Sequence, residues 1–199
     1  MISKKRKIKE IAGLNLGHTF RVSPNITKEE ASFSLVQVKD VDINGNLLLG
    51  QLETINHKFS RTVDLLQKGD IIFCPRDHKL IAALVTIDLE NTLISAPLIL
   101  IRVHCQKTIN PEYLQLYLNS KLIEKRLKSL LLGSSILTLQ KSDLAEIEVP
   151  IPSIKEQELL SKIYSYSKLE RKLRDNLYGL KNKERNAIVN KSLESLLAA

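Results

Sequence analysis

The sequence predicts a mixed α/β domain followed by one long C-terminal α-helix. Three observations support this fold class. Short apolar runs rich in β-branched residues, separated by turn signals, fill the first hundred residues. A helical pattern follows them. From residue 154 to about 198 the chain contains no proline and a single glycine, Gly179, so one helix fits the whole stretch. We therefore expect a globular domain over residues 1–152 and a helical region over 153–199.

The predicted strands lie between clear turn signals. Asn44-Gly45-Asn46 is a strong turn sequence, and Gly69-Asp70 turns the chain into a short apolar run typical of buried strands. Residues 14–21 are expected to form a loop. We expect an entry strand or turn over residues 8–12 and strands over 33–38, 47–55, 71–74, 80–87 and 96–103.

A helix is predicted from Asn110 to Gly133. Asn110 is a favourable N-cap, Pro111 takes the first helical position, where its missing N–H costs nothing, and Gly133 can adopt the left-handed C-cap conformation. The predicted apolar face comprises Leu114, Tyr117, Leu118 and Leu122, extended by Leu127, Leu130 and Leu131.

The segment over residues 133–157 joins the domain to the long helix. Ser153 and Glu156 have the spacing of a capping box, in which each side chain serves the backbone amide of the other. We expect this ordered join to set the angle between the two parts. Before the capping box it should hold a short strand over residues 136–139, a helical turn starting at Ser142 and an extended stretch over 148–152.

The long helix carries leucines that step by four, four and three residues, as in a coiled coil. An apolar stripe on a long helix needs a partner surface, which predicts a homodimer. The alternative is that the helix docks wholly on its own domain. The residues expected to form the dimer contact are Leu169, Leu173, Leu177, Leu180 and Ile188.

The net charge of +8 and the pI near 9.4 favour an anionic partner, with nucleic acid ahead of a membrane surface. No uncharged apolar stretch is long enough to span a membrane. Cys74 and Cys105 lack the spacing of a metal site or of a disulfide framework, which predicts a cytoplasmic protein.

The motifs of catalysis and of cofactor binding are missing from the sequence. There is no phosphate-binding glycine loop, no nucleophile elbow and no zinc-protease motif. The four histidines are scattered. Asp40 and Asp42 could suggest a nuclease, but the rest of such a site does not follow, so we interpret them as turn residues. We therefore expect a binding protein without enzymatic activity and without a cofactor.

Basic side chains in predicted loops are the candidates for DNA contact. Arg and Lys can bind phosphates or the acceptor edge of guanine, and serines after a helix end can donate to phosphate or base. Each residue alone could equally be an ordinary solvated side chain. The candidates are Lys39, Lys58, Arg61, Arg76, Lys79, Ser134 and Ser135.

Several short segments occur in an order and spacing that resemble one known family. The prolines of the join, followed by Glu156-Gln157, are the most diagnostic part. The segments lie at residues 69–73, 96–102, 110–114, 118–120, 133–136 and 147–152. Over nearly its whole length the chain resembles the specificity (S) subunit of Type I restriction–modification enzymes.

This resemblance implies a function and a set of partners. Full-length S subunits carry two recognition domains, with helices that pack as an antiparallel coiled coil. The present chain has one of each, so it resembles a half-length S subunit or a fragment. The resemblance implies binding to double-stranded DNA, to methyltransferase (M) subunits and to a nuclease–translocase (R) subunit.

Two hypotheses follow from this resemblance. In the first, a homodimer recognises two inverted half-sites in DNA and directs modification and cleavage there. In the second, the chain is an S-like decoy or antirestriction protein, which occupies M subunits or DNA without directing modification.

Overall fold

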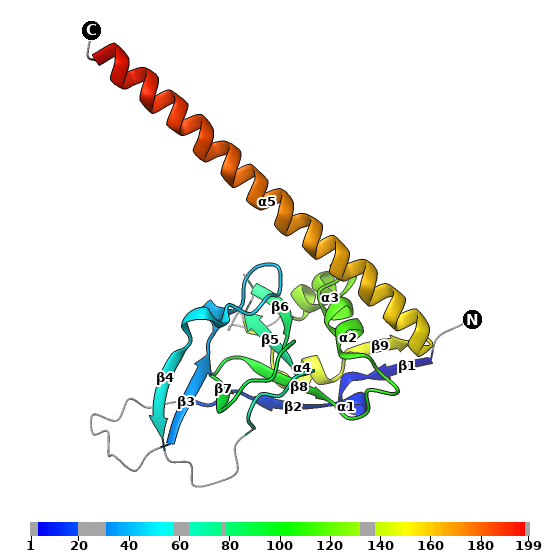
Figure 1. Ribbon diagram of the computed structural model, residues 1–199. Helices are drawn as coiled ribbons and strands as arrows, with labels where there is room; N and C mark the ends of the chain where they lie inside the picture. The colour runs from blue at the N-terminus through cyan, green and yellow to red at the C-terminus, as the bar shows by residue number, and fades with distance from the viewer. Residues whose placement is uncertain (1–3, 20–30, 58–63, 77–78, 132–137, 198–199) are drawn as a thin grey trace. The chain divides into compact units, whose positions relative to one another are not determined.

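The computed structural model describes residues 4–19, 31–57, 64–76, 79–131 and 138–197. The chain divides into two compact units, Met1–Leu159 and Leu160–Ala199. The first unit is a mixed α/β domain, and the second consists of the greater part of a long helix (Figure 1). The predicted fold class is confirmed.

Three small sheets form the framework of the first unit (Figure 1). The largest is antiparallel, in the order β2 (Ala12–Leu16), β8 (Ile99–Val103), β5 (Ile71–Arg76) and β6 (Lys79–Leu84). The second has the order β4 (Glu53–His57), β3 (Ala31–Val36) and β7 (Thr92–Ile94), with β3 and β7 parallel. The third pairs β1 (Lys4–Lys7) with β9 (Glu148–Ile151).

Strand β5 separates two hydrophobic cores. Ile71 and Phe73 belong to the first core, and Ile72 and Cys74 belong to the second. Successive side chains of a strand point to opposite faces, so a strand covered on both faces must be apolar throughout. This explains the unbroken apolar run. The first core also takes residues from the helices that follow residue 110, and the second takes residues from β3 and β7.

The predicted helix over 110–133 is in fact two helices, α2 (Pro111–Leu118) and α3 (Lys121–Leu131). Asn119 interrupts it because its amide pairs with the edge of β6: Oδ1 accepts from the Ala82 N–H at 2.7 Å, and Nδ2 donates to the Ala82 carbonyl at 2.8 Å. The Asn110 cap is confirmed by its bond to the Glu112 amide. Leu122 does not join the apolar face, because it lies after the break and is 73% exposed.

The turn at residues 44–46 is confirmed, and it places Asp42 as a turn residue. The Asp42 carboxylate accepts the backbone amides of Asn44 and Asn46, each at 2.8 Å. Gly45 has φ +68°, and a Cβ there would lie 2.5 Å from the Ala82 carbonyl oxygen, so only glycine fits this approach to β6. The strand expected over 47–55 is shorter: a 3₁₀ turn at Leu49–Gln51 precedes β4.

Three of the described strands were not predicted. β1 precedes the entry strand or turn expected over residues 8–12, and the chain there forms the short helix α1 (Ile8–Ile11). β7 is only three residues long, too short for a pattern to show. β2 falls partly in the expected loop over 14–21, because pairing with the buried strand β8 overrides the weak strand propensity of Gly13 and Asn15.

The join contains α4 (Lys141–Ala145) and β9, as expected, before α5 (Ile154–Leu197) begins. The Ser153–Glu156 capping box is confirmed: the Ser153 amide donates to Glu156 Oε2 at 2.9 Å, and the Glu156 amide donates to Ser153 Oγ at 3.4 Å. The Ser153 hydroxyl also donates to Glu156 Oε2 at 2.6 Å, and this bond, together with that from the Ser153 amide, lowers the pKa of Glu156. Residues 132–137, with the expected Gly133 cap and part of the expected strand over 136–139, lie outside the described residues.

Candidate functional site

The structure describes the side chains of only two of the candidates for DNA contact. Lys58, Arg61, Ser134 and Ser135 lie outside the described residues, as does the side chain of Lys79. The structure describes the remaining two candidates, Lys39 and Arg76, and both are exposed.

Arg76 stands where two distant stretches of the chain meet. It is the last residue of β5, and its backbone forms an antiparallel bridge with Thr138. The Leu139 amide donates to the Pro75 carbonyl at 2.7 Å, and the Leu139 side chain is buried. Arg76 and Thr138 therefore lie side by side, although some 60 residues separate them in the sequence.

Lys39 lies beside a different sheet. It belongs to the 3₁₀ turn Val38–Asp40, and its Nζ is 3.6 Å from Glu53 Oε2, at the first residue of β4. Lys39 and Arg76, the two candidates whose side chains the structure describes, are therefore held by different sheets.

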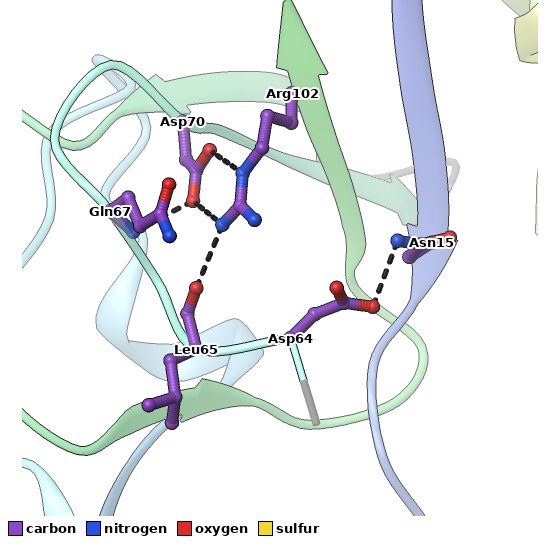
Figure 2. A network of polar contacts seen from close by, with 6 residues as sticks. All are labelled: Asn15, Asp64, Leu65, Gln67, Asp70 and Arg102. Atoms are coloured by element: carbon purple, nitrogen blue, oxygen red, sulfur yellow. Dashed lines mark hydrogen bonds and ion pairs between the residues drawn. The ribbon is translucent and has the colours of Figure 1, made fainter. Parts of the chain in front are cut away.

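Arg102 of β8 holds the segment over residues 65–70 in place (Figure 2). Its Nε and one terminal nitrogen donate to the two Asp70 carboxylate oxygens, each at 2.7 Å, and the terminal nitrogen also donates to the Leu65 carbonyl at 2.7 Å. The Gln67 amide donates to the same carboxylate at 2.8 Å. The Asp70 side chain is 2% exposed, and its hydrogen bonds raise the pKa of Arg102.

A second bond holds the start of the same segment. Asn15 of β2 donates from Nδ2 to Asp64 Oδ2 at 2.8 Å (Figure 2). Residues 64–70 are thus tied to two neighbouring strands, β2 and β8, of the largest sheet. These bonds hold the described chain in place from Asp64, which is three residues after Arg61 in the sequence. The sequence analysis missed the pairing of Asp70 with Arg102, although both residues lie in segments of the family resemblance.

Gln157 locks the join into the domain. Its buried amide accepts from the Asn110 N–H at 2.8 Å and donates to the carbonyls of Thr108 at 3.1 Å and Pro152 at 2.9 Å. The first turn of α5 is therefore fixed to the N-terminus of α2. In the diagnostic Glu156-Gln157 pair, Glu156 thus caps α5, and Gln157 hydrogen-bonds α5 to the start of α2.

Two tyrosines of α2 hold β9 from the side opposite β1. Tyr113 Oη donates to the Pro150 carbonyl at 2.8 Å, and Tyr117 Oη donates to the Glu148 carbonyl at 2.6 Å. Burial raises the pKa of Tyr113 to about 12 and raises that of Tyr117. Pro150 has no N–H to donate. The strand tolerates it because the tyrosine at this position needs only the Pro150 carbonyl as an acceptor.

No group of histidine, cysteine or acidic side chains that could hold a metal ion occurs in the described residues. The described helices include none that is long and apolar enough to cross a membrane. Cys74 is buried and Cys105 is exposed, and neither forms a disulfide bond.

Comparison with protein families identifies the chain. The model of the Type I restriction modification DNA specificity domain matches residues 4–177. The chain belongs to this family. The resemblance inferred from the sequence is confirmed, and the family consists of specificity domains, which are non-catalytic. A comparison with curated proteins gave no match.

Solved structures of specificity subunits have the same fold. A chain described under complex assembly and conformational transition of the type I R-M system has a TM-score of 0.66 and 22% identity, over 86% of this chain and 43% of that chain. The HsdS subunit from Thermoanaerobacter tengcongensis gives 0.63 and 23%, over 87% and 44%. The S subunit from M. genitalium gives 0.52 and 18%, over 82% and 38%. The chain thus spans less than half the length of the specificity subunits that it matches.

Proposed function

We propose that this chain recognises a DNA sequence for a Type I restriction–modification system. The match of the specificity-domain model to residues 4–177 carries the proposal. The recognition domain would comprise residues 1–152, with its contacts at the loops around Arg76, Lys79, Ser134 and Ser135 and around Lys39, Lys58 and Arg61. Binding would direct M subunits, which carry the methyl donor, and an R subunit to the target in the cytoplasm.

A homodimer would supply the second recognition domain. The chain matches less than half of each solved specificity subunit, and its helical region over 153–199 exposes a row of large apolar side chains. Leu169, Leu173, Leu177 and Leu180 are each more than half exposed on α5. Such a row is costly in water unless another surface covers it. Two identical recognition domains would then bind two inverted half-sites at a fixed spacing.

Co-expression with a cognate M subunit, followed by mapping of methylated bases in the host DNA, tests this function. We expect one methylated motif that consists of two inverted half-sites around a non-specific spacer. The matched control is the M subunit expressed alone, which should leave this motif unmethylated. A stable complex with the M subunit that methylates no motif would instead support the decoy hypothesis.

A further inference from the structure

The exposed surface of helix α3 carries an excess of positive charge, and its cations are not among the candidate DNA contacts in the loops. Ile123, Leu127 and Leu131 bury one side of this helix in the first core. The exposed surface carries four cations and a single acid, Glu124, which pairs with one of the lysines at 2.6 Å. The exposed cations are Lys121, Lys125, Arg126 and Lys128.

Three of these cations line up along one side of the helix. Lys121, Lys125 and Lys128 are spaced by four and three residues, which places them on one exposed stripe beside the buried side. Their backbones rise by about 10 Å from first to last. One strand of B-DNA places a phosphate about every 3.4 Å along its axis, so the stripe matches the length of about three phosphates.

A short segment connects the end of α3 to the candidate contact at Arg76. α3 ends at Leu131, and the described chain resumes at Thr138, which bridges to Arg76. Seven residue steps separate Leu131 from Thr138, so their Cα atoms are at most about 25 Å apart. One helical turn of B-DNA is about 34 Å long, so a duplex contacted at Arg76 is long enough to reach the end of α3 as well.

We infer that Lys121 and Lys125 of this stripe, whose third member Lys128 is paired with Glu124, bind the phosphate backbone of the DNA duplex that the recognition domain reads. The contact is independent of base sequence and sets the register of the duplex on the domain. This inference rests on the proposed function, because it assigns a second surface to the same DNA.

The other basic segment of the domain is a weaker candidate for phosphate binding. β1 and α1 (Ile8–Ile11) carry Lys7 and Lys9, but both ammonium groups bind the Glu146 carboxylate, so their charge is largely offset. Lys4 and Lys5 of β1 are exposed and therefore provide a matched control with the same change of charge.

The test uses the complex with the M subunit and measures DNA binding by fluorescence anisotropy between 50 and 200 mM salt, on the methylated motif and on a scrambled duplex. For Lys121→Ala/Lys125→Ala we expect a loss of about 100- to 1,000-fold at physiological salt on both duplexes, because the homodimer loses four lysines. The slope of log affinity against log salt should fall by about 4, since each phosphate contact contributes about 0.9. Lys121→Arg/Lys125→Arg should restore the slope, and Lys4→Ala/Lys5→Ala should leave it unchanged.

Each other outcome contradicts the inference in its own way. An unchanged slope with normal binding by the wild-type complex would overturn the phosphate contact and leave the proposed function intact. A loss confined to the methylated motif would assign these lysines to base recognition. Loss of the M subunit from the complex, with DNA affinity retained by the chain, would make α3 a protein-binding surface. A wild-type complex that binds neither duplex would contradict both proposals.

Discussion

At the scale of single residues, Asp70 is the most demanding position in the domain. Its carboxylate is almost fully buried, and its partners in the described part of the chain are one guanidinium and one backbone amide. Removing one partner from such a pair leaves the other charge without compensation, which is the costly way to break a buried ion pair. Arg102 is itself 35% exposed, so water recovers part of that cost.

We therefore expect Asp70→Asn to lower the free energy of unfolding by about 2 kcal/mol, measured by urea denaturation. The control is Glu124→Gln, which removes an exposed pair with Lys128 and should cost less than about 0.5 kcal/mol. Equal effects of the two changes would show that the Asp70 pair is not the anchor of residues 64–70.

Glu146 provides a pH dependence. Hydrogen bonds from Lys7 and Lys9 lower the pKa of its carboxyl to about 2, from an ordinary 4.5. A group whose pKa is lowered in the folded state stabilises the protein above its unfolded pKa, and this stabilisation disappears as the pH falls from about 4.5 to about 2.

Glu146→Gln should therefore be less stable than the wild type at pH 7, and the difference should shrink between pH 4.5 and pH 2. Urea denaturation at several pH values measures it. The groups are exposed, so added salt should also reduce the difference. A difference that is constant with pH would mean that the ion pairs contribute nothing in solution.

At the scale of elements, the join depends on Gln157. Its side chain hydrogen-bonds to Asn110, Thr108 and Pro152 and so connects the first turn of α5, the end of β9 and the N-terminus of α2. Gln157→Leu keeps the volume but leaves a buried N–H and two carbonyls without that partner, which should cost about 3 kcal/mol. Hydrogen exchange at the Asn110 amide should become faster.

Gln157→Glu separates the roles of the amide, because a carboxylate can accept from Asn110 but cannot donate to Thr108 or Pro152. We expect it to be no better than Gln157→Leu. Lys155→Ala, an exposed neighbour on the same turn, serves as the control and should leave the stability and the Asn110 exchange rate unchanged. Slow exchange in Gln157→Leu would show that the side-chain hydrogen bonds of Gln157 are dispensable.

The elements also show which parts of the fold can be predicted from the sequence and which cannot. Caps and prolines act within a few residues, so the starts of α2 and α5 and the extended β9 were predictable. The break at Asn119 depends on Ala82, 37 residues away, and Arg102 pairs with Asp70 across 32 residues. Such long-range pairs leave no local pattern. The candidate site was predictable only as a set of basic loops, and the separate positions of Lys39 and Arg76 follow from the sheets.

At the scale of the whole molecule, the dimer proposal depends on one side of α5. At about 100° per residue, Leu169, Leu173, Leu177, Leu180 and Ile188 fall within an arc of about 100°, whereas Leu193 and Leu196 lie on the other side of the helix. A dimer contact along this stripe should therefore end near Ile188. Gly179 does not interrupt the helix, so the stripe is continuous through it.

Leu173→Glu places a charge in the middle of this stripe, and we expect it to convert the dimer into a monomer in light scattering. Asn186→Glu adds the same charge on the other side of the helix and should remain dimeric. A dimer binds its second half-site intramolecularly, so the monomer should lose about 100-fold or more in affinity for a duplex with both half-sites. Its affinity for a single half-site should not change, because the recognition domain is untouched.

Dissociation of the dimer by both variants, or a monomeric wild type, would exclude this stripe as the dimer contact. An equal loss of affinity for both duplexes would mean that the helix acts on DNA recognition itself.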